Sequence, residues 1–145
     1  MKSCLGPTIL TMACWLTAGC ATRVPSPEAV PLDRVECARC RMLISSDSGA
    51  SQIVAASEDT RFYDDIACLA ADWDRRPAHA VAYVRLADGR WIDAHDASYL
   101  RMSEVRTAMA SGVMAVASIA DARAIDRQAS VLTFDQIIHN QEGVR

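Results

Sequence analysis

Short apolar stretches bounded by turn residues predict strands in the first half of the chain. Residues 51–57 and 60–63 form two such stretches, with turn residues between them. The period then changes to that of a helix, which Asp64 is placed to cap and Pro77 to end. The apolar positions that recur there at three- and four-residue spacing are Ile66, Leu69, Ala70 and Trp73. This half of the chain therefore predicts a strand, strand, helix unit.

The second half predicts a similar mixture. A strand at 80–86, the turn Asp88-Gly89 and a strand at 90–93 make a hairpin. Further along, the sequence predicts a strand at 113–118, a helix at 120–128, a brief extended step at 131–132, and a last helix from a capping box at Thr133 and Gln136 to about Asn140. We expect an α+β fold with mostly antiparallel strands.

A faint internal echo relates the two halves. Phe62-Tyr-Asp-Asp-Ile66 resembles Phe134-Asp-Gln-Ile137, and each stretch opens a predicted helix some 20 to 25 residues after a methionine, Met42 or Met109. Short echoes arise readily by chance. If this one is genuine, two similar strand-and-helix units place both methionines near their junction, where one shared site can form.

The N-terminus has the layout of an export signal. Residues 1–19 of the 145 contain Lys2, an apolar run and then small residues before Cys20. A membrane-spanning anchor is the alternative, but the apolar run is short for the ~20 residues that a span needs. Leu16-Thr-Ala-Gly-Cys20 resembles the bacterial lipobox, which implies a lipid on Cys20 and a protein that faces the periplasm or the cell exterior, held in the inner or the outer membrane.

Beyond the signal, composition divides the chain into a tether and a domain. Pro25, Pro27 and Pro31 favour an extended tether at 20–35, and residues 36–145 form the domain. Removing 1–19 leaves 14 Arg against 18 Asp and Glu, a net charge of −4. This balance excludes a nucleic-acid partner that needs a basic face.

The chemistry concentrates in Cys37-Ala-Arg-Cys40-Arg-Met42, which puts two thiols and a thioether within six residues. Soft sulfur ligands favour Cu(I). A Cys37–Cys40 disulfide in an oxidising compartment explains the pair equally well, and Met42 can be a core residue. The motif alone leaves metal and disulfide open.

The remaining candidates favour structural roles. After processing, only Cys37, Cys40 and Cys68 remain as thiols, and an odd number cannot pair internally. Cys68 is expected to be a small buried apolar residue in the first helix. Asp64 and Asp65 are expected to cap that helix, and His95 is at most an auxiliary ligand.

Several separated stretches together resemble the NosL family of copper-binding lipoproteins. They are Cys37-x-x-Cys40-x-Met42, Gln52-Ile53-Val54, Phe62-x-Asp64-Asp65-Ile66, Trp91-Ile92-Asp93-Ala94, Thr107-x-Met109-x-Ser111-Gly112 and Val131-Leu132-Thr133-Phe134-Asp135. The resemblance extends from Cys37 to Ile138. It implies two similar strand-strand-helix units, related to part of organomercurial lyase.

The resemblance also implies a function. Proteins of that family are not enzymes but periplasmic accessories that deliver Cu(I) to nitrous oxide reductase, and a membrane transporter is a possible further partner. Carried onto this chain, the implied metal ligands are Cys37, Cys40, Met42 and Met109. Arg41 stands where the family usually has glycine before the first methionine. Around the second methionine the family usually has a proline and a glycine, where this chain has Ala108 and Ala110.

Two other functions stay open. A Cys37–Cys40 disulfide describes a structural or docking lipoprotein. Cys68 near Asp64 is the one hint of a thiol-based lyase that cleaves carbon–metal bonds, because organomercurial lyase uses paired cysteines with an aspartate. We expect the chaperone function and no enzymatic activity.

Overall fold

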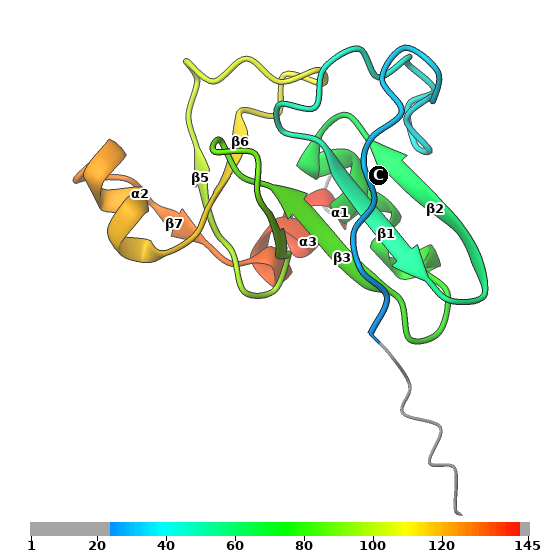
Figure 1. Ribbon diagram of the computed structural model, residues 1–145. Coiled ribbons are helices and arrows are strands. Elements are labelled where there is room, and N and C mark those ends of the chain that lie inside the picture. Colours follow the sequence, from blue (N-terminus) through cyan, green and yellow to red (C-terminus); the bar gives the residue numbers. More distant parts are fainter. Residues whose placement is uncertain (1–23, 143–145) are drawn as a thin grey trace, which may run out of the picture.

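The chain folds as an α+β domain with two antiparallel sheets, as the sequence predicts (Figure 1). The structure is a computed structural model that describes residues 24–142. The larger sheet has the order β2-β1-β3-β4, with β1 (Ser51–Ala55), β2 (Glu58–Tyr63), β3 (Val81–Arg85) and β4 (Trp91–Asp93). The smaller sheet has the order β6-β5-β7, with β5 (Ser98–Arg101), β6 (Val113–Val116) and β7 (Val131–Leu132).

Each sheet begins with two paired strands that are followed by a helix. The helices are α1 (Ile66–Asp72), which the 3₁₀ turn η1 (Trp73–Arg75) continues, α2 (Ile119–Ile125) and α3 (Phe134–Glu142). The order strand, strand, helix therefore occurs twice, as β1-β2-α1 and as β5-β6-α2. The predicted capping box opens α3, because the backbone N–H of Thr133 donates to Gln136 Oε1 at 2.9 Å and that of Gln136 donates to Thr133 Oγ1 at 3.3 Å.

One hydrophobic core joins the two units. Helices α1 and α3 pack against each other, and the ring of Phe134 on α3 meets that of Trp73 edge to face at 5.6 Å between centroids. Tyr63 and Tyr99, one from each sheet, are completely buried in the same core. The hydroxyl of Tyr99 donates to the carbonyl oxygen of Ala94 at 2.7 Å, so its burial leaves no unpaired polar group.

Two details differ from the sequence prediction. The strand β5 was not predicted, although it is the central strand of the smaller sheet. It has four residues and buries the adjacent pair Tyr99 and Leu100, so it lacks the alternation that marks a half-exposed strand. The predicted turn at 58–59 lies two residues earlier, at 56–57, and β2 starts at Glu58.

Part of the predicted tether lies along the larger sheet (Figure 1). The buried side chain of Gln52 in β1 accepts from the backbone N–H of Glu28 and donates to its carbonyl oxygen, both at 2.9 Å. Tyr83 donates to the carbonyl oxygen of Pro25 at 2.8 Å. The boundaries at 20–35 and 36–145 stay predictions. The signal at 1–19 and Cys20 lie outside the described residues, and within 24–142 no helix is long and apolar enough to cross a membrane.

The loop at 102–112, between β5 and β6, contains two residues with left-handed backbone, Ala110 (φ 54°) and Gly112 (φ 64°). A Cβ atom added to Gly112 meets the carbonyl oxygen of Met102 at 2.4 Å, so only glycine fits there. The backbone N–H of Met102 donates to the carbonyl oxygen of Gly112 at 2.9 Å and closes the loop.

Opposite substitutions in this loop should change stability in opposite directions. Gly112→Ala adds a clash to an unfavourable φ and should lower the free energy of unfolding by about 2–3 kcal/mol. Ala110→Gly relieves a strained φ and should raise that free energy by up to about 1 kcal/mol. Urea denaturation of the purified protein measures both values. Gly49→Ala is the control, because Gly49 has φ 75° but open space around its Cβ position. Its free energy of unfolding should fall by less than that of Gly112→Ala.

Candidate metal centre

The Cys37–Met42 segment forms a tight loop that turns back on itself. The backbone N–H of Cys37 donates to the carbonyl oxygen of Met42 at 2.8 Å, and that of Arg41 donates to the carbonyl oxygen of Cys37 at 3.0 Å. Arg41 closes the turn with φ 68°, a left-handed conformation that favours glycine. The backbone N–H of Ala38 donates to the carbonyl oxygen of Phe62 at 2.8 Å, so β2 holds the loop against the domain.

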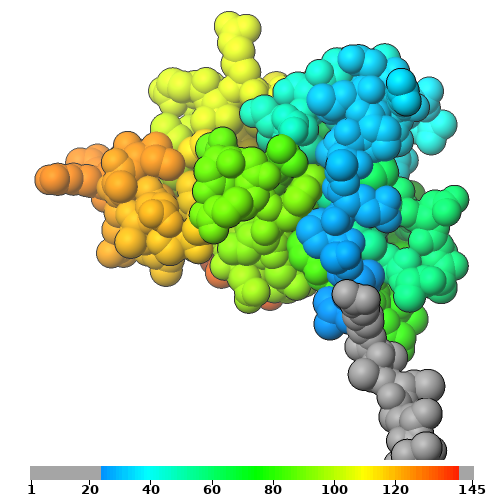
Figure 2. All heavy atoms as spheres, in the orientation of Figure 1, coloured from blue at the N-terminus to red at the C-terminus, as the bar shows by residue number. Residues whose placement is uncertain are grey.

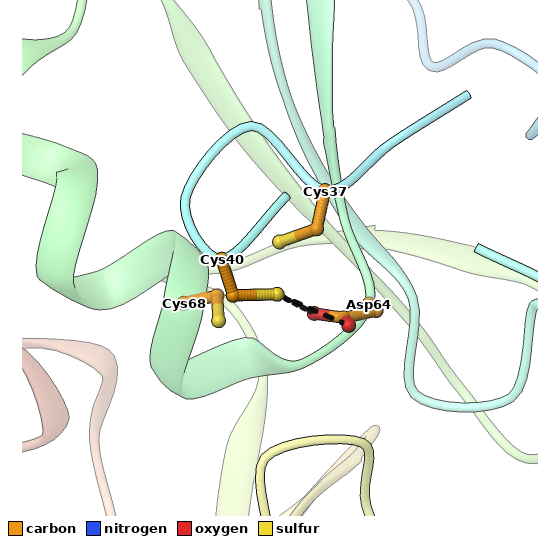
Figure 3. A group of neighbouring side chains, drawn as sticks. All are labelled: Cys37, Cys40, Asp64 and Cys68. Carbon is orange, nitrogen blue, oxygen red and sulfur yellow. Dashed lines mark hydrogen bonds between the residues drawn. The ribbon is translucent and has the colours of Figure 1, made fainter. Parts of the chain in front are cut away.

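Four side chains from three segments converge at this loop. Cys37 and Cys40 come from the loop, Asp64 follows β2, and Cys68 lies in the first turn of α1 (Figure 3). Their ligand atoms all lie within 4.8 Å of one another. Cys37, Asp64 and Cys68 are buried, whereas Cys40 is partly exposed. We call this set the Cys37–Cys68 cluster.

The start of α1 explains why Asp64 can join the cluster. Asp65, not Asp64, is the N-cap of the helix, and its Oδ1 accepts from the backbone N–H of Ala67 at 2.8 Å. The predicted capping role of Asp64 is therefore wrong. Because Asp65 accepts from a backbone N–H at the start of the helix, the carboxylate of Asp64 is free to contact Cys40. The Sγ atom of Cys40 donates to the two carboxylate oxygens of Asp64 at 3.4 and 3.6 Å.

The three thiols of the cluster differ in pKa. A hydrogen bond from the Cys68 thiol, outweighing burial, lowers the pKa of Cys37 to about 6. The same hydrogen bond, together with burial, raises the pKa of Cys68. Burial is the largest of the causes that raise the pKa of Cys40 to about 11, and the carboxylate of Asp64 adds to it. Cys37 is therefore the thiol of the cluster that loses its proton most readily.

The two predicted methionine ligands lie on the open side of the cluster. Met109 is 48% exposed and lines a hollow of about 440 Å³ together with Cys40 and Cys68. Met42 is 41% exposed and lines a second hollow with Asp64. Each methionine therefore shares a hollow with members of the cluster, Met109 with Cys40 and Cys68 and Met42 with Asp64.

A buried carboxylate holds the Met109 loop in place. Asp65 is 1% exposed, and besides capping α1 it accepts from the backbone N–H of Met109 at 3.1 Å and from Ser111 Oγ at 2.7 Å. Thr107 Oγ1 accepts from the backbone N–H of Ser111 at 3.0 Å and tightens the same loop. Asp65 thus fixes the position of Met109 relative to the first turn of α1, which contains Cys68.

His95 takes no part in the cluster. Its ring packs against Trp73 at 5.5 Å and against Phe134 at 5.0 Å between centroids, and its Nδ1 lies 3.4 Å from Asp93 Oδ1. Its exposed ring thus covers the aromatic contact between Trp73 and Phe134 from outside the core. Its predicted role as an auxiliary ligand has no support in this arrangement.

The cluster suits a soft ion. Three sulfur atoms within reach of one another favour Cu(I) and other thiophilic ions over ions that require oxygen ligands. Cys37, Cys40 and Cys68 are all free thiols in the structure. A thiol loses its proton to solvent when it binds such an ion, whereas a thioether has no proton to lose.

Sequence reasoning missed Cys68 and Asp64 as members of the group. Cys68 is buried as expected, but it is buried against two other sulfur atoms. The odd number of thiols was a signal, because a third thiol in an exported domain needs burial, a partner or a metal. The ligand assignment to Cys37, Cys40, Met42 and Met109 stays a prediction.

Comparison with known proteins supports the fold at low sequence identity. No protein-family profile matches the sequence, and no curated protein is significantly similar to it. Among solved structures, the crystal structure of the copper chaperone NosL from Shewanella denitrificans aligns with a TM-score of 0.59 and 18% identity, covering 77% of this chain and 95% of that one. The chain therefore has the fold of NosL, as the resemblance of its motifs implies.

Proposed function

We propose that this protein is a Cu(I) chaperone that passes its ion to a copper enzyme outside the cytoplasm. The observation that carries the proposal is the Cys37–Cys68 cluster beside an open hollow, in a fold that it shares with a copper chaperone. A protein that only stores a metal can enclose it with four ligands. A protein that delivers one needs an accessible side, and here that side has thioethers and a partly exposed thiol.

The proposed ligands form an inner and an outer set. On the buried side, the thiolates of Cys37 and Cys40 hold the ion and Cys68 lies within reach. On the open side, Met109 and Met42 complete the ligand set, each from the hollow that it lines. Because Cys40 is partly exposed and belongs to both sides, an acceptor can replace the inner ligands one at a time.

The cellular setting of the proposal comes from the sequence. The lipobox-like Leu16–Cys20 stretch supports a lipid anchor on Cys20 and a periplasmic location. The resemblance to the NosL family favours nitrous oxide reductase as the copper enzyme. Incubating the Cu(I)-loaded protein with the metal-free reductase tests this recipient, and failure to restore copper to the reductase would reject it without affecting the Cu(I) site.

We expect one tightly bound Cu(I) per reduced chain, lost on removal of a thiol. Cys40→Ser should weaken binding about 100-fold, because one thiolate of a sulfur site contributes roughly 3 kcal/mol. Met109→Leu should weaken it about tenfold, since a neutral thioether contributes less. Anaerobic titration against a chromogenic Cu(I) chelator measures these affinities.

Matched variants make this titration specific. Met114→Leu removes a thioether that packs against Leu100, Val116 and Ala122, a group separate from the core that contains Cys37 and Cys68, and should leave the affinity unchanged. Cys68→Ser separates the ligand sets: a loss as large as that of Cys40→Ser adds Cys68 to the ligands, and no loss leaves it as a buried neighbour. Wild-type affinity in both Cys40→Ser and Met109→Leu would contradict the proposed site.

The hydrogen bonds from the Met109 loop to Asp65 form what we call the Asp65 clamp. Weakening this clamp should lower Cu(I) affinity as much as removing the Met109 thioether does. Asp65→Asn still caps α1 but loses a carboxylate acceptor for the loop, so Cu(I) affinity should fall about tenfold. In the double variant with Met109→Leu, the second change should add nothing, because both act through one contact. The same chelator titration measures this coupling.

Ser118→Ala is the control for stability. It removes the N-cap of α2, where the Ser118 side chain accepts from the backbone N–H of Asp121 at 3.1 Å, and should cost about 1 kcal/mol of stability without changing Cu(I) affinity. In the double variant, losses of Cu(I) affinity that add up to the sum of the two single losses would show that Asp65 does not act through Met109.

A further inference from the structure

The face that opens to the metal centre has a positive rim on a protein that is negative overall. Arg39 and Arg101 line the hollow that contains Met109, and Arg106 lines the hollow that contains Met42. Arg101 and Arg106 together line a third hollow along the loop at 102–112. The whole chain has a net charge of −3, so the sign of this face is opposite to that of the molecule.

Few carboxylates offset this charge. Of the described residues that line the three hollows, three are arginines and one, the buried Asp64, is acidic. Arg39 lies 3.7 Å from Asp72, and Arg41 next to the site pairs with Glu36 at 2.8 Å.

Arg101 and Arg106 remain available. Both are exposed, and neither forms an ion pair with a residue in the described range 24–142, although the exposed Glu104 lies in the same loop. Such unpaired guanidinium groups are free to bind a carboxylate on another molecule.

Exposed apolar side chains line the same hollows as these arginines. Met42, Met109 and Leu43, which is 53% exposed, are three of the exposed large apolar residues of the domain. The segments that contain them lie at the same end of the molecule, where the blue-to-cyan and yellow parts of the chain meet (Figures 1 and 2). Exposed apolar residues beside unpaired charges are typical of a protein-docking surface.

We propose that this face docks a protein acceptor whose copper entrance is surrounded by carboxylates. The inference rests on the proposed function, because an acceptor must bring its sulfur or nitrogen ligands into bonding contact with the bound ion. Arg101 and Arg106 attract the acidic rim and orient the approach, and the exposed methionines and Leu43 form the contact. Charge thus selects the acceptor, and the sulfur cluster supplies the ion.

Two synthetic acceptor peptides test the proposal. Both contain the same Cys-x-x-Cys and a fluorophore that Cu(I) quenches; glutamates flank the cysteines in one and lysines in the other. Stopped-flow mixing with the Cu(I)-loaded protein should show transfer to the glutamate peptide about tenfold faster at low ionic strength, and this preference should shrink in high salt.

Paired arginine variants locate the effect. Arg101→Gln/Arg106→Gln should reduce the preference to less than about twofold while Cu(I) affinity stays at the wild-type value. Arg123→Gln/Arg127→Gln is the matched control, since it removes two exposed arginines in and after α2, far from the metal centre (Figure 1), and should keep the preference.

Three results would overturn the docking proposal. They are equal transfer rates to both peptides from the wild-type protein, the same loss of preference in the control pair, and weakened Cu(I) binding in Arg101→Gln/Arg106→Gln, which would place these arginines in the metal site itself. A wild-type protein that binds no Cu(I) in the chelator titration would instead refute the proposed function.

Discussion

The buried carboxylate of Asp65 is the contact on which the candidate site depends. It caps α1 through the backbone N–H of Ala67 and holds the loop between β5 and β6 through Met109 and Ser111. A buried carboxylate is costly unless its oxygens accept several hydrogen bonds, and these three donors meet that need. The helix that contains Cys68 and the loop that contains Met109 are therefore fixed to each other by one side chain, across the junction of the two strand-and-helix units.

The contacts of Asp65 also explain why the neighbouring residues Asp64 and Asp65 have different roles. With Asp65 capping the start of α1, Asp64, which follows β2, lies beside Cys40 and accepts a hydrogen bond from its thiol. Burial is the largest cause of the raised pKa of Cys40, and the carboxylate of Asp64 adds to it, because a carboxylate next to a thiol disfavours the thiolate. An arriving cation removes this repulsion, so metal binding and deprotonation of Cys40 support each other.

Much of the fold could be predicted from the sequence, because several strands are apolar stretches between clear turns and α3 opens with a capping box. The hairpin of β3 and β4 and the capping box at Thr133 are local features, and local patterns reveal them. The strand β5 and the role of Cys68 depend on tertiary packing instead. Four residues with two adjacent buried side chains show no period, and a buried cysteine in a helix looks the same in sequence whether its neighbours are methyl groups or thiols.

Two positions at which this chain departs from the NosL pattern have left-handed backbone in the structure. Arg41 and Ala110 stand where that family usually has glycine, and both have left-handed backbone, with φ of 68° and 54°. Each residue belongs to one of the two loops that flank the metal centre. A non-glycine residue in this conformation lowers the stability of the folded state by roughly 1–2 kcal/mol. The same residue restricts the unfolded chain more than glycine does, which offsets part of that loss. Both loops are therefore held by surrounding contacts, the turn of Cys37 and Met42 on one side and the Asp65 clamp on the other, and not by intrinsic backbone preference.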